Sequence, residues 1–372
     1  MTARTTKNPL RLFLRVGWAR CPLVSGVAGM MTVVPDLPDR PVLLAVDGNS
    51  LLHRSYHAFL GSGTRTAAGA ATWAIRGLFS QLGLLIDRVR ADGLVVGFDD
   101  AGNNRRKRTH PEYKATRSEK DPDLVAQLDL AVRVLRDAGA HVVVPEGLEA
   151  DDVVAAAAQE AAIAGWDTVI ATSDRDAFAL VDDTTRLLRL ISGGVDASPV
   201  LTRDRMRLLT GVWPEQYREL AALRGDTSDN LAGVRGIGPK TGARLLAELG
   251  TVAAALADPE RTRALLGARV AEVFASAQAQ EVFARNVELM TPEPVATGLD
   301  LAAGAGRLPL DEHVVRTALD RVELGAVCRP AVRALCGLEF SAPPVPTQPS
   351  APERRTPVMV ASVVRETAWT LF

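Results

Sequence analysis

Acidic side chains recur along the chain, several of them just after apolar runs. Asp47 and Asp99 each end such a run, and Asp174 follows a third. Two carboxylates about 4 Å apart repel by roughly 4 kcal/mol at an effective dielectric constant near 20, so a cluster of acids requires bound cations or shared protons. Oxygen ligands without nearby His or Cys favour Mg²⁺ or Mn²⁺, and these ions point to phosphate chemistry. The candidate metal ligands are Asp47, Asp99, Glu149, Asp151, Asp152, Asp174, Asp176, Asp226 and Asp229.

Taken singly, each of these acids also has an ordinary structural interpretation. An Asp after a strand commonly forms a turn or caps a helix, and the run from Glu149 to Asp152 suits an acidic first helical turn. The acids in that run exceed what capping requires, however, and Asp151 and Asp152 would point about 100° apart on a helix. They are therefore expected to address two different neighbours, whereas Asp174 and Asp176 share one side of an extended chain.

The elements that must position these acids are strands followed by helices. Helical patterns separate successive apolar runs, and this alternation predicts an α/β fold with a parallel sheet. Ligands bind beyond the carboxyl ends of the strands in such a sheet, so we expect the acids to meet at that edge. The predicted strands are 42–46, 94–98, 142–144 and 168–172, and the predicted helices between them are 71–89, 123–138 and 151–164.

The chain after about residue 203 is predicted to be helical, without further clear strands. Its helices would form a lobe packed on the sheet. We expect them at 203–210, 214–224, 240–249 and 261–290.

The composition describes a globular protein with no global preference for a polyanion. The chain has 372 residues, of which 47% are hydrophobic and 23% are charged, and this allows a large core. Its net charge is −1 and its pI about 6.6, so a nucleic-acid partner requires a local basic face. No apolar run reaches the length that spans a bilayer, and three scattered cysteines suit neither a disulfide framework nor a zinc site. We therefore expect a cytoplasmic protein with no membrane partner.

Residues Arg105–Lys120 form a local basic segment directly after Asp99. Such a charge run is usually a solvated loop. Its position over the acidic edge would, however, let its cations clamp a phosphate beside the metals, and Tyr113 within it can stack an unpaired base.

A second motif lies in the predicted helical lobe, where Gly236-Ile-Gly238 precedes Lys240 and Thr241. Closely spaced glycines make a tight turn whose backbone N–H groups can face a phosphate, and the N-terminus of the following helix adds to this. The string resembles helix-hairpin-helix elements, which grip a DNA backbone without reading its sequence. The alternative is a structural turn between two helices.

Together these motifs resemble the 5′-nuclease family, which includes the 5′ nuclease domain of bacterial family A DNA polymerases and the flap endonucleases. The similarity covers roughly residues 41–290. It is carried, in this order, by LLAVDGNSLLHRSYHAF, VVGFD, RTHPEYKATR, GLEADDVVAA, ATSDRDAFALV and LRGDTSDNLAGVRGIGPKTGARLL. The resemblance implies a PIN-like α/β catalytic domain at 41–202 with a helical arch at about 100–122, and a helical lobe with a helix-hairpin-helix DNA-binding element at 203–340.

The family's site residues carry over position by position. Every acid named above matches a metal ligand of the family, and none is missing. By resemblance, Lys114 and Arg117 contact the scissile phosphate and Arg106 the flap or gateway, while Arg54 lies near the substrate. His110 stands where the family often has an aromatic residue. The resemblance therefore supports passage of the flap through the arch less directly than it supports metal binding.

The resemblance implies a 5′-3′ exonuclease and flap endonuclease that hydrolyses DNA near junctions of single strand and duplex, in replication and repair. Two Mg²⁺ ions about 4 Å apart, replaceable by Mn²⁺, would activate a water and stabilise the leaving 3′ oxygen. Asp174 would lie between two groups of ligands. These are Asp99, Glu149, Asp151 and Asp152 at one ion, and Asp176, Asp226 and Asp229 at the other.

The expected substrate is DNA with a 5′ flap, nick or end, with an RNA primer as an alternative. The hairpin at Gly236 and Gly238 would hold the downstream duplex and bind K⁺, as it often does in relatives. No polymerase domain follows, so we expect a stand-alone, monomeric nuclease. A non-catalytic junction-binding protein and a nuclease acting mainly on RNA are alternative hypotheses. The complete set of metal-binding acids argues against a non-catalytic protein. The helix-hairpin-helix element favours duplex DNA as the substrate and so argues against a nuclease that acts mainly on RNA.

The two ends of the chain have less specific patterns. Residues 1–40 are expected to be a dispensable leader or a start placed too early, and a secretory signal is the alternative. Residues 341–372 are rich in proline and are expected to be disordered. The terminal Leu371 and Phe372 loosely resemble peptides that bacterial replication proteins insert into the sliding clamp, although they would also suit docking on their own domain.

Overall fold

The computed structural model describes residues 40–338 of the chain. The expectations for the leader, the proline-rich tail and the clamp-binding end lie outside the described residues. No helix within the described part is long and apolar enough to cross a membrane.

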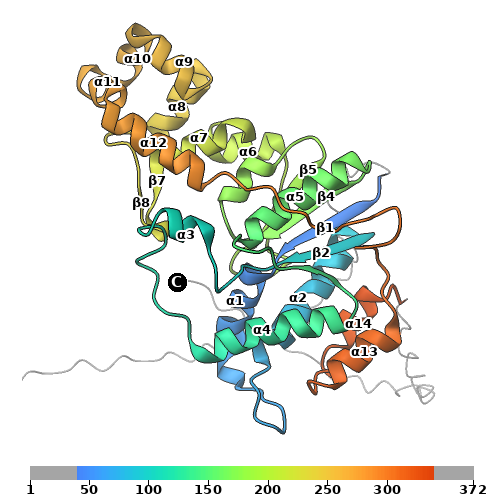
Figure 1. The fold of residues 1–372 in the computed structure, drawn as a ribbon. Helices are drawn as coiled ribbons and strands as arrows, with labels where there is room; N and C mark the ends of the chain where they lie inside the picture. Colours follow the sequence, from blue (N-terminus) through green and yellow to red (C-terminus); the bar gives the residue numbers. More distant parts are fainter. Residues whose placement is uncertain (1–39, 339–372) are drawn as a thin grey trace, which may run out of the picture.

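A six-stranded sheet with the order β3-β2-β1-β4-β5-β6 forms the centre of the fold (Figure 1). β1 to β5 run parallel, and β6 pairs antiparallel with β5. The predicted parallel sheet is therefore confirmed, and the last two strands are additions to it. The strands are β1 (Val42–Asp47), β2 (Gly93–Gly97), β3 (His141–Val143), β4 (Asp167–Thr172), β5 (Thr185–Arg189) and β6 (Val200–Leu201).

β1 is buried along its whole length because helices cover both faces of the sheet. Successive side chains of a strand point to opposite faces. Leu44 and Val46 accordingly enter one hydrophobic core, while Leu43 and Ala45 enter the other. This two-sided burial explains why the strand reads as a continuous apolar run instead of an alternating one.

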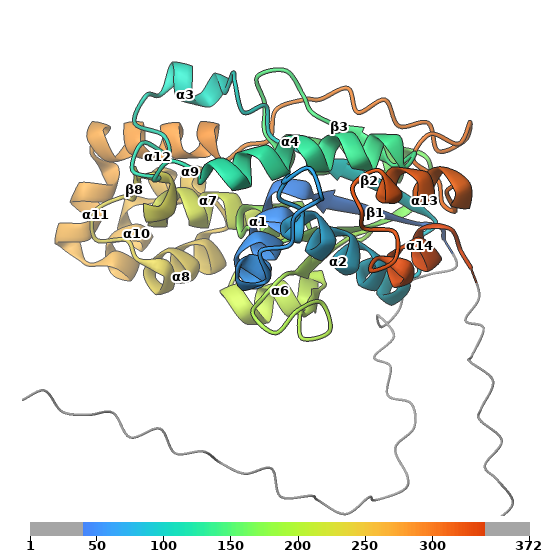
Figure 2. The same cartoon turned by 90° about the horizontal axis from the view of Figure 1, so that it is seen from below.

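Several helices share the first of these cores. α14 lies against α2, and α13 lies against α4 (Figures 1 and 2). The C-terminal pair therefore packs with the sheet domain, which differs from the expected division that placed everything from 203 to 340 in the helical lobe. The helices are α1 (Gly48–Phe59), α2 (Trp73–Val89), α4 (Pro122–Asp137), α13 (Glu312–Asp320) and α14 (Arg329–Leu335).

The second core joins α5 (Ala150–Ile163), on the other face of the sheet, to the helical lobe. α8 to α11 lie at the end of the molecule opposite α13 and α14 (Figures 1 and 2). The lobe comprises α6 (Arg203–Thr210), α7 (Pro214–Arg224), α8 (Pro239–Leu249), α9 (Val252–Ala257), α10 (Pro259–Leu266), α11 (Ala268–Ala275) and α12 (Ala277–Leu289).

Two details of the lobe correct the sequence-based expectations. The single helix expected at 261–290 is wrong, because Gly267 has a left-handed φ of 80° and Ser276 is extended, so three helices replace it. A two-stranded hairpin of β7 (Gly225–Asp226) and β8 (Leu231–Ala232) was also not expected. Strands this short leave no periodic signal in the sequence.

Candidate functional site

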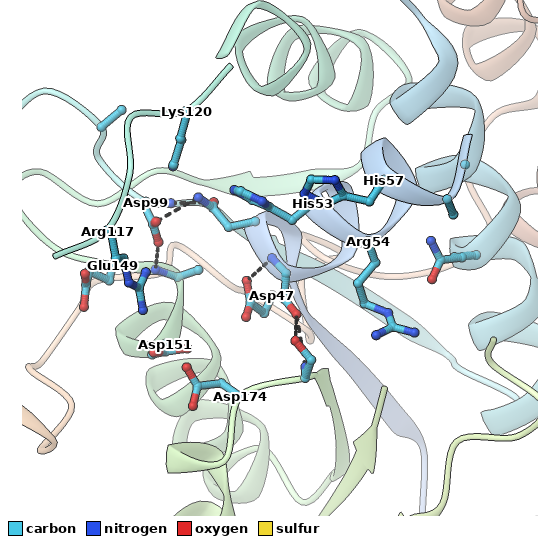
Figure 3. A pocket seen from close by; sticks show the side chains of 18 of the residues that line it. Asp47, His53, Arg54, His57, Asp99, Arg117, Lys120, Glu149, Asp151 and Asp174 are labelled. Carbon is cyan, nitrogen blue, oxygen red and sulfur yellow. Dashed lines mark hydrogen bonds between the residues drawn. The ribbon is translucent and has the colours of Figure 1, made fainter. Parts of the chain in front are cut away.

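Five acids from the predicted set line one pocket of about 1410 Å³ at the carboxyl edge of the sheet (Figure 3). One ends β1, and others lie just after β2 and β4, as the parallel topology requires. The remaining two come from the N-terminus of α5. These acids are Asp47, Asp99, Glu149, Asp151 and Asp174.

Hydrogen bonds across neighbouring elements hold the first two acids in place. Asp47 accepts from the Ser50 N–H at 2.9 Å and from the Thr172 hydroxyl at 2.7 Å. Asp99 accepts from the Ala150 N–H at 3.0 Å. Asp47 therefore both caps α1 and faces the pocket, so the capping interpretation and the functional one are compatible.

The carboxylates in the pocket crowd one another. Burial, followed by the charges of Asp99 and Asp174, raises the pKa of Asp47 to about 7. Burial and the charges of Asp174 and Asp47 also raise the pKa of Asp151 well above its usual range. Raised pKa values show that the ionised carboxylates destabilise one another, and bound cations would relieve this repulsion.

A second group of acids lies beside the first. Burial, followed by the charges of Asp174, Asp226 and Asp229, raises the pKa of Asp176 to about 7. The Asp176 Oδ1 atom is buried and has no hydrogen-bond partner among residues 40–338. Because the charge of Asp174 raises the pKa values of both Asp151 and Asp176, Asp174 lies close to acids of both groups.

Asp152 is placed differently from its neighbour Asp151. Its side chain is fully buried and accepts hydrogen bonds from Arg106 at 2.7 and 2.9 Å. It also accepts from the N–H groups of Glu149 at 2.9 Å and Glu293 at 2.7 Å. Both of its oxygens are thus engaged in an internal ion pair, and neither Asp152 nor Arg106 is among the residues that line the pocket.

The basic segment is less helical than the arch implied at about 100–122. It contains only the short helix α3 (Arg105–Thr109), followed by turns. Tyr113 within it is 4% exposed and donates a hydrogen bond to Glu149 at 3.2 Å. The burial of Tyr113 and Arg106 anchors the segment, so the structure does not place these two side chains where they would stack a base or contact a flap.

Two cations of the basic segment do reach the acids. Lys114 Nζ lies 2.6 Å from Glu149 Oε1, and Arg117 pairs with Asp229. Burial lowers the pKa of Lys114, but the charges of Glu149 and Asp229 outweigh it and leave that pKa above its ordinary value. Burial raises the pKa of Glu149. The charges of Lys114 and Arg106 together outweigh this effect, so the pKa of Glu149 lies below its ordinary value.

The remaining predicted DNA contacts are spread over two regions. Arg54 lines the pocket from α1 and donates to the Ile191 carbonyl, while its Nε is buried without a partner in the described part of the chain. The hairpin before α8 has Gly236 at a φ of 89°. Gly236, Gly238 and Lys240 are exposed there, Thr241 is partly exposed, and none of these four residues lines the pocket.

Sequence reasoning missed several pocket residues on α1. Asn49 donates to Asp99 at 2.8 Å, and Ser50 shares a hydrogen bond of 2.6 Å with Ser173. His53 and His57 also line the pocket (Figure 3). Their spacing of four residues on a helix that follows Asp47 is the signal that points to them.

The donor set fits divalent metal ions held partly through water. No group of three or more His, Cys, Asp or Glu side chains within residues 40–338 is arranged to hold one ion directly. Mg²⁺, however, usually keeps several waters and uses only one or two carboxylates. The carboxylate oxygens at the acidic end of the pocket suit such an ion, and so does the unpartnered Asp176 Oδ1, which lies outside the pocket lining.

Solved structures that share this fold include two T5 nucleases. A T5 5′-exonuclease with bound zinc ions has a TM-score of 0.55 at 21% identity, covering 79% of this chain and 98% of that one. A T5 flap endonuclease in a pseudo-enzyme-product complex with DNA and metal ions has a TM-score of 0.53 at 21% identity, with coverage of 79% and 98%. At this level of identity the likeness establishes the fold alone.

Curated relatives give a closer sequence match. DNA polymerase I of Mycobacterium bovis is 34% identical over 228 residues, which cover 61% of this chain and 25% of that protein. DNA polymerase I of Deinococcus radiodurans is 32% identical over 324 residues, which cover 85% of this chain and 32% of that protein. The chain thus spans about a quarter to a third of the length of these relatives.

Two family models match consecutive parts of the chain. The N-terminal resolvase-like domain of the 5′-3′ exonucleases matches residues 42–207, and their C-terminal SAM fold matches residues 212–300. The first contains the sheet and its acids, and the second contains most of the helical lobe. The chain therefore belongs to the 5′-3′ exonuclease family.

Proposed function

We propose that the protein is a metal-dependent 5′-3′ exonuclease and flap endonuclease that hydrolyses DNA phosphodiesters near junctions of single strand and duplex. The observation that carries this proposal is the placement of acids and cations in one pocket. Acids from three strand ends and one helix start lie beneath Lys114 and Arg117 of the basic segment. Acids to hold metals and cations to hold phosphate are the two requirements of metal-assisted phosphodiester cleavage.

The acids divide by position into ligands for two ions. Asp99, Glu149 and Asp151 would serve one ion, Asp176, Asp226 and Asp229 the other, and Asp174 both. When bound, the two Mg²⁺ ions supply positive charge that activates the attacking water and stabilises the leaving oxygen. The resemblance assigns Asp152 to the first ion, whereas its engagement with Arg106 supports an indirect role, in which it fixes the start of α5 and thereby orients Asp151.

The cations of the basic segment would hold the scissile phosphate. A DNA phosphate entering the pocket competes with Glu149 for Lys114 and with Asp229 for Arg117, since each cation already has an anionic partner. Charge-assisted bonds from these two side chains to the non-bridging oxygens would orient the phosphodiester over the acids. The Lys114 side chain is only 12% exposed, which limits water access and strengthens its contact, whereas the Arg117 side chain is 50% exposed.

The hairpin before α8 would bind the duplex. The exposed Gly236, Gly238 and Lys240, with Thr241, suit contacts to the phosphates of one strand, and a K⁺ ion held there would add positive charge for those phosphates. Such contacts carry no base information, so substrate choice would depend on the junction itself.

The proposal is tested by mapping products on matched substrates. The protein is incubated with 5′-labelled DNA flap, nicked duplex, RNA-primed duplex and single-stranded RNA, in Mg²⁺ or in EDTA. Release of short 5′ products from the flap and the nick in Mg²⁺ alone is expected, with downstream products that carry a 5′ phosphate. Binding without turnover would identify a non-catalytic junction-binding protein, and preferential cutting of single-stranded RNA would identify a ribonuclease; either result contradicts the proposal.

A further inference from the structure

A single buried hydroxyl connects two of the candidate metal ligands. Thr172 is the last residue of β4, and its side chain is fully buried. β4 pairs in parallel with β1, so the end of β4 lies beside Asp47, which ends β1. The Thr172 Oγ1 atom is 2.7 Å from Asp47 Oδ2 and 3.0 Å from the backbone N atom of Asp174. Asp47 and Asp174 both line the pocket (Figure 3).

The hydrogen bonds of this hydroxyl have only one possible direction. A hydroxyl has one proton to donate, and a backbone N–H can only donate. Thr172 therefore accepts from the Asp174 N–H and donates its own proton to Asp47. Asp174 Oδ1 in turn accepts from the Asp176 N–H at 2.9 Å. Hydrogen bonds thus run from Asp176 through Asp174 and Thr172 to Asp47, and they join three of the candidate ligands.

Burial on β4 does not by itself account for these contacts. Thr168 lies four residues earlier on the same strand, and therefore on the same face of the sheet. Its side chain is also buried, yet its hydroxyl has no hydrogen-bond partner within residues 40–338. The engagement of Thr172 with two acids is therefore specific to the end of the strand, where the pocket begins.

The two contacts of Thr172 fix the positions of both acids. Asp47 receives one donor on each oxygen, the Ser50 N–H on Oδ1 and the Thr172 hydroxyl on Oδ2, so its carboxylate is held from two sides. The N–H that Thr172 accepts belongs to Asp174 itself, so the same hydroxyl also anchors the turn after β4. Partners that hydrogen-bond a metal ligand from outside typically change metal affinity about 10- to 100-fold when they are removed.

We propose that Thr172 is a positioning residue of the metal site, which orients Asp47 through the proton that it donates and Asp174 through the N–H that it accepts. This rests on the proposed function, in which these acids belong to the set that holds divalent ions. Thr172 is not among the residues that line the pocket, so it acts through the two acids and not on the substrate. Its loss should therefore weaken ion binding before any DNA is present.

The test compares variants that keep or remove this hydroxyl. Mn²⁺ binding is measured by isothermal titration of the metal-free protein in the absence of DNA. Thr172→Val removes the hydroxyl at nearly constant shape, whereas Thr172→Ser keeps it. Thr168→Val is the matched control, since it removes an equally buried hydroxyl from the same face of the same strand. Thr172→Val is also combined with Asp47→Ala.

Thr172→Val is expected to bind Mn²⁺ about 10- to 100-fold more weakly than the wild type does. Thr172→Ser and Thr168→Val should bind Mn²⁺ nearly as the wild type does. When Asp47 is already Ala, Thr172→Val should weaken binding by a smaller factor, because the acceptor of its proton is gone. The Mg²⁺ concentration that gives half-maximal flap cleavage should rise for Thr172→Val and not for Thr168→Val.

Unchanged Mn²⁺ binding by Thr172→Val, or equal weakening by Thr172→Ser or by Thr168→Val, would overturn the positioning role. So would a loss from Thr172→Val that is as large with Asp47→Ala as without it. Thermal melts in EDTA identify a folding defect, and Thr172→Ala supplies a second variant without the hydroxyl. If the wild type binds Mn²⁺ but cuts no flap in Mg²⁺, the proposed nuclease function fails, while the Mn²⁺ titrations still decide the role of Thr172.

Discussion

Lys114 Nζ lies 2.6 Å from Glu149 Oε1, and the two side chains are only 12% and 7% exposed. The pair joins the basic segment to the acidic end of the pocket. An ammonium group in this position neutralises a carboxylate that would otherwise attract a divalent ion. Lys114 is therefore expected to have two effects, holding phosphate during cleavage and competing with metal for Glu149.

Lys114→Met should separate these two effects. We expect single-turnover flap cleavage to fall by about 10²- to 10³-fold, as when a preorganised donor to a reacting oxygen is removed. Divalent-ion binding in the absence of DNA should become tighter, because Glu149 loses its cationic partner. Isothermal titration with Mn²⁺ and quenched-flow cleavage measure the two. Arg108→Met, at an exposed position of the same segment, should leave both unchanged, and weaker Mn²⁺ binding by Lys114→Met would contradict the competition.

The pair of Asp152 and Arg106 is expected to stabilise the fold without binding metal. Breaking a buried ion pair by removing one partner costs about 3–5 kcal/mol, because the other charge is left uncompensated. Arg106→Met should therefore lower the free energy of unfolding in EDTA, and Arg106→Met with Asp152→Leu should recover much of it. Denaturant unfolding measures the change. If Asp152→Asn leaves stability in EDTA intact but weakens metal binding, Asp152 is a ligand after all.

Stability in EDTA should depend on pH through Asp47. Its pKa is raised from 3.8 to about 7, so the folded state binds a proton more tightly than the unfolded state does. The resulting stabilisation is full below about pH 4 and is lost as the pH rises through 7. His53 acts in the opposite sense, since its pKa is lowered to about 4 and its contribution is lost as the pH falls.

Asp47→Asn isolates the carboxyl effect. The difference in melting temperature between wild type and variant in EDTA should change between pH 5 and pH 8, with the wild type losing stability relative to the variant as the pH rises. Saturating Mg²⁺ should reduce this dependence, because the bound cation favours the ionised acid. A pH-independent difference would show that Asp47 is ionised throughout.

The hairpin that carries Asp226 and Asp229 depends on a close backbone approach. Gly225 has a φ of 75°, and a Cβ added to it would lie 2.3 Å from the Gly233 N atom. Gly250 has a similar φ of 84° but open space around its Cα. Gly250→Ala should therefore cost about 1–2 kcal/mol from backbone strain alone. Gly225→Ala should cost more and also weaken Mn²⁺ binding, and equal losses would argue against the steric account.

The parts of the site that follow from short-range pattern could be predicted from the sequence. Asp47 and Asp99 follow buried strands, and parallel topology brings strand ends to one edge whatever the details of packing. The sequence predicts that Asp151 and Asp152 point in different directions, but not which of them contacts Arg106. That depends on how α5 is rotated against the rest of the chain.

Long-range pairing accounts for what could not be predicted. In the sequence, the run of cations around Arg106 and Lys114 is typical of a solvated arch. In the structure, these two side chains are instead held against an acid more than thirty residues away, and this fixes the position of the segment. Tyr113 is buried for the same reason. The packing of α13 and α14 on α4 and α2 likewise depends on contacts that no local periodicity encodes.

The most direct test of the central claim is single-turnover cleavage of a 5′-labelled DNA flap as a function of Mg²⁺, by wild type, Asp174→Asn and Asp204→Asn. Asp174 lies close to acids of both groups, whereas Asp204 is exposed on α6. We expect cleavage by wild type and Asp204→Asn that requires Mg²⁺, and a loss of about 10³-fold or more for Asp174→Asn. The account would be contradicted if cleavage persists in EDTA, if the Asp174→Asn variant cleaves as fast as the wild type, or if the wild type fails to cleave in Mg²⁺.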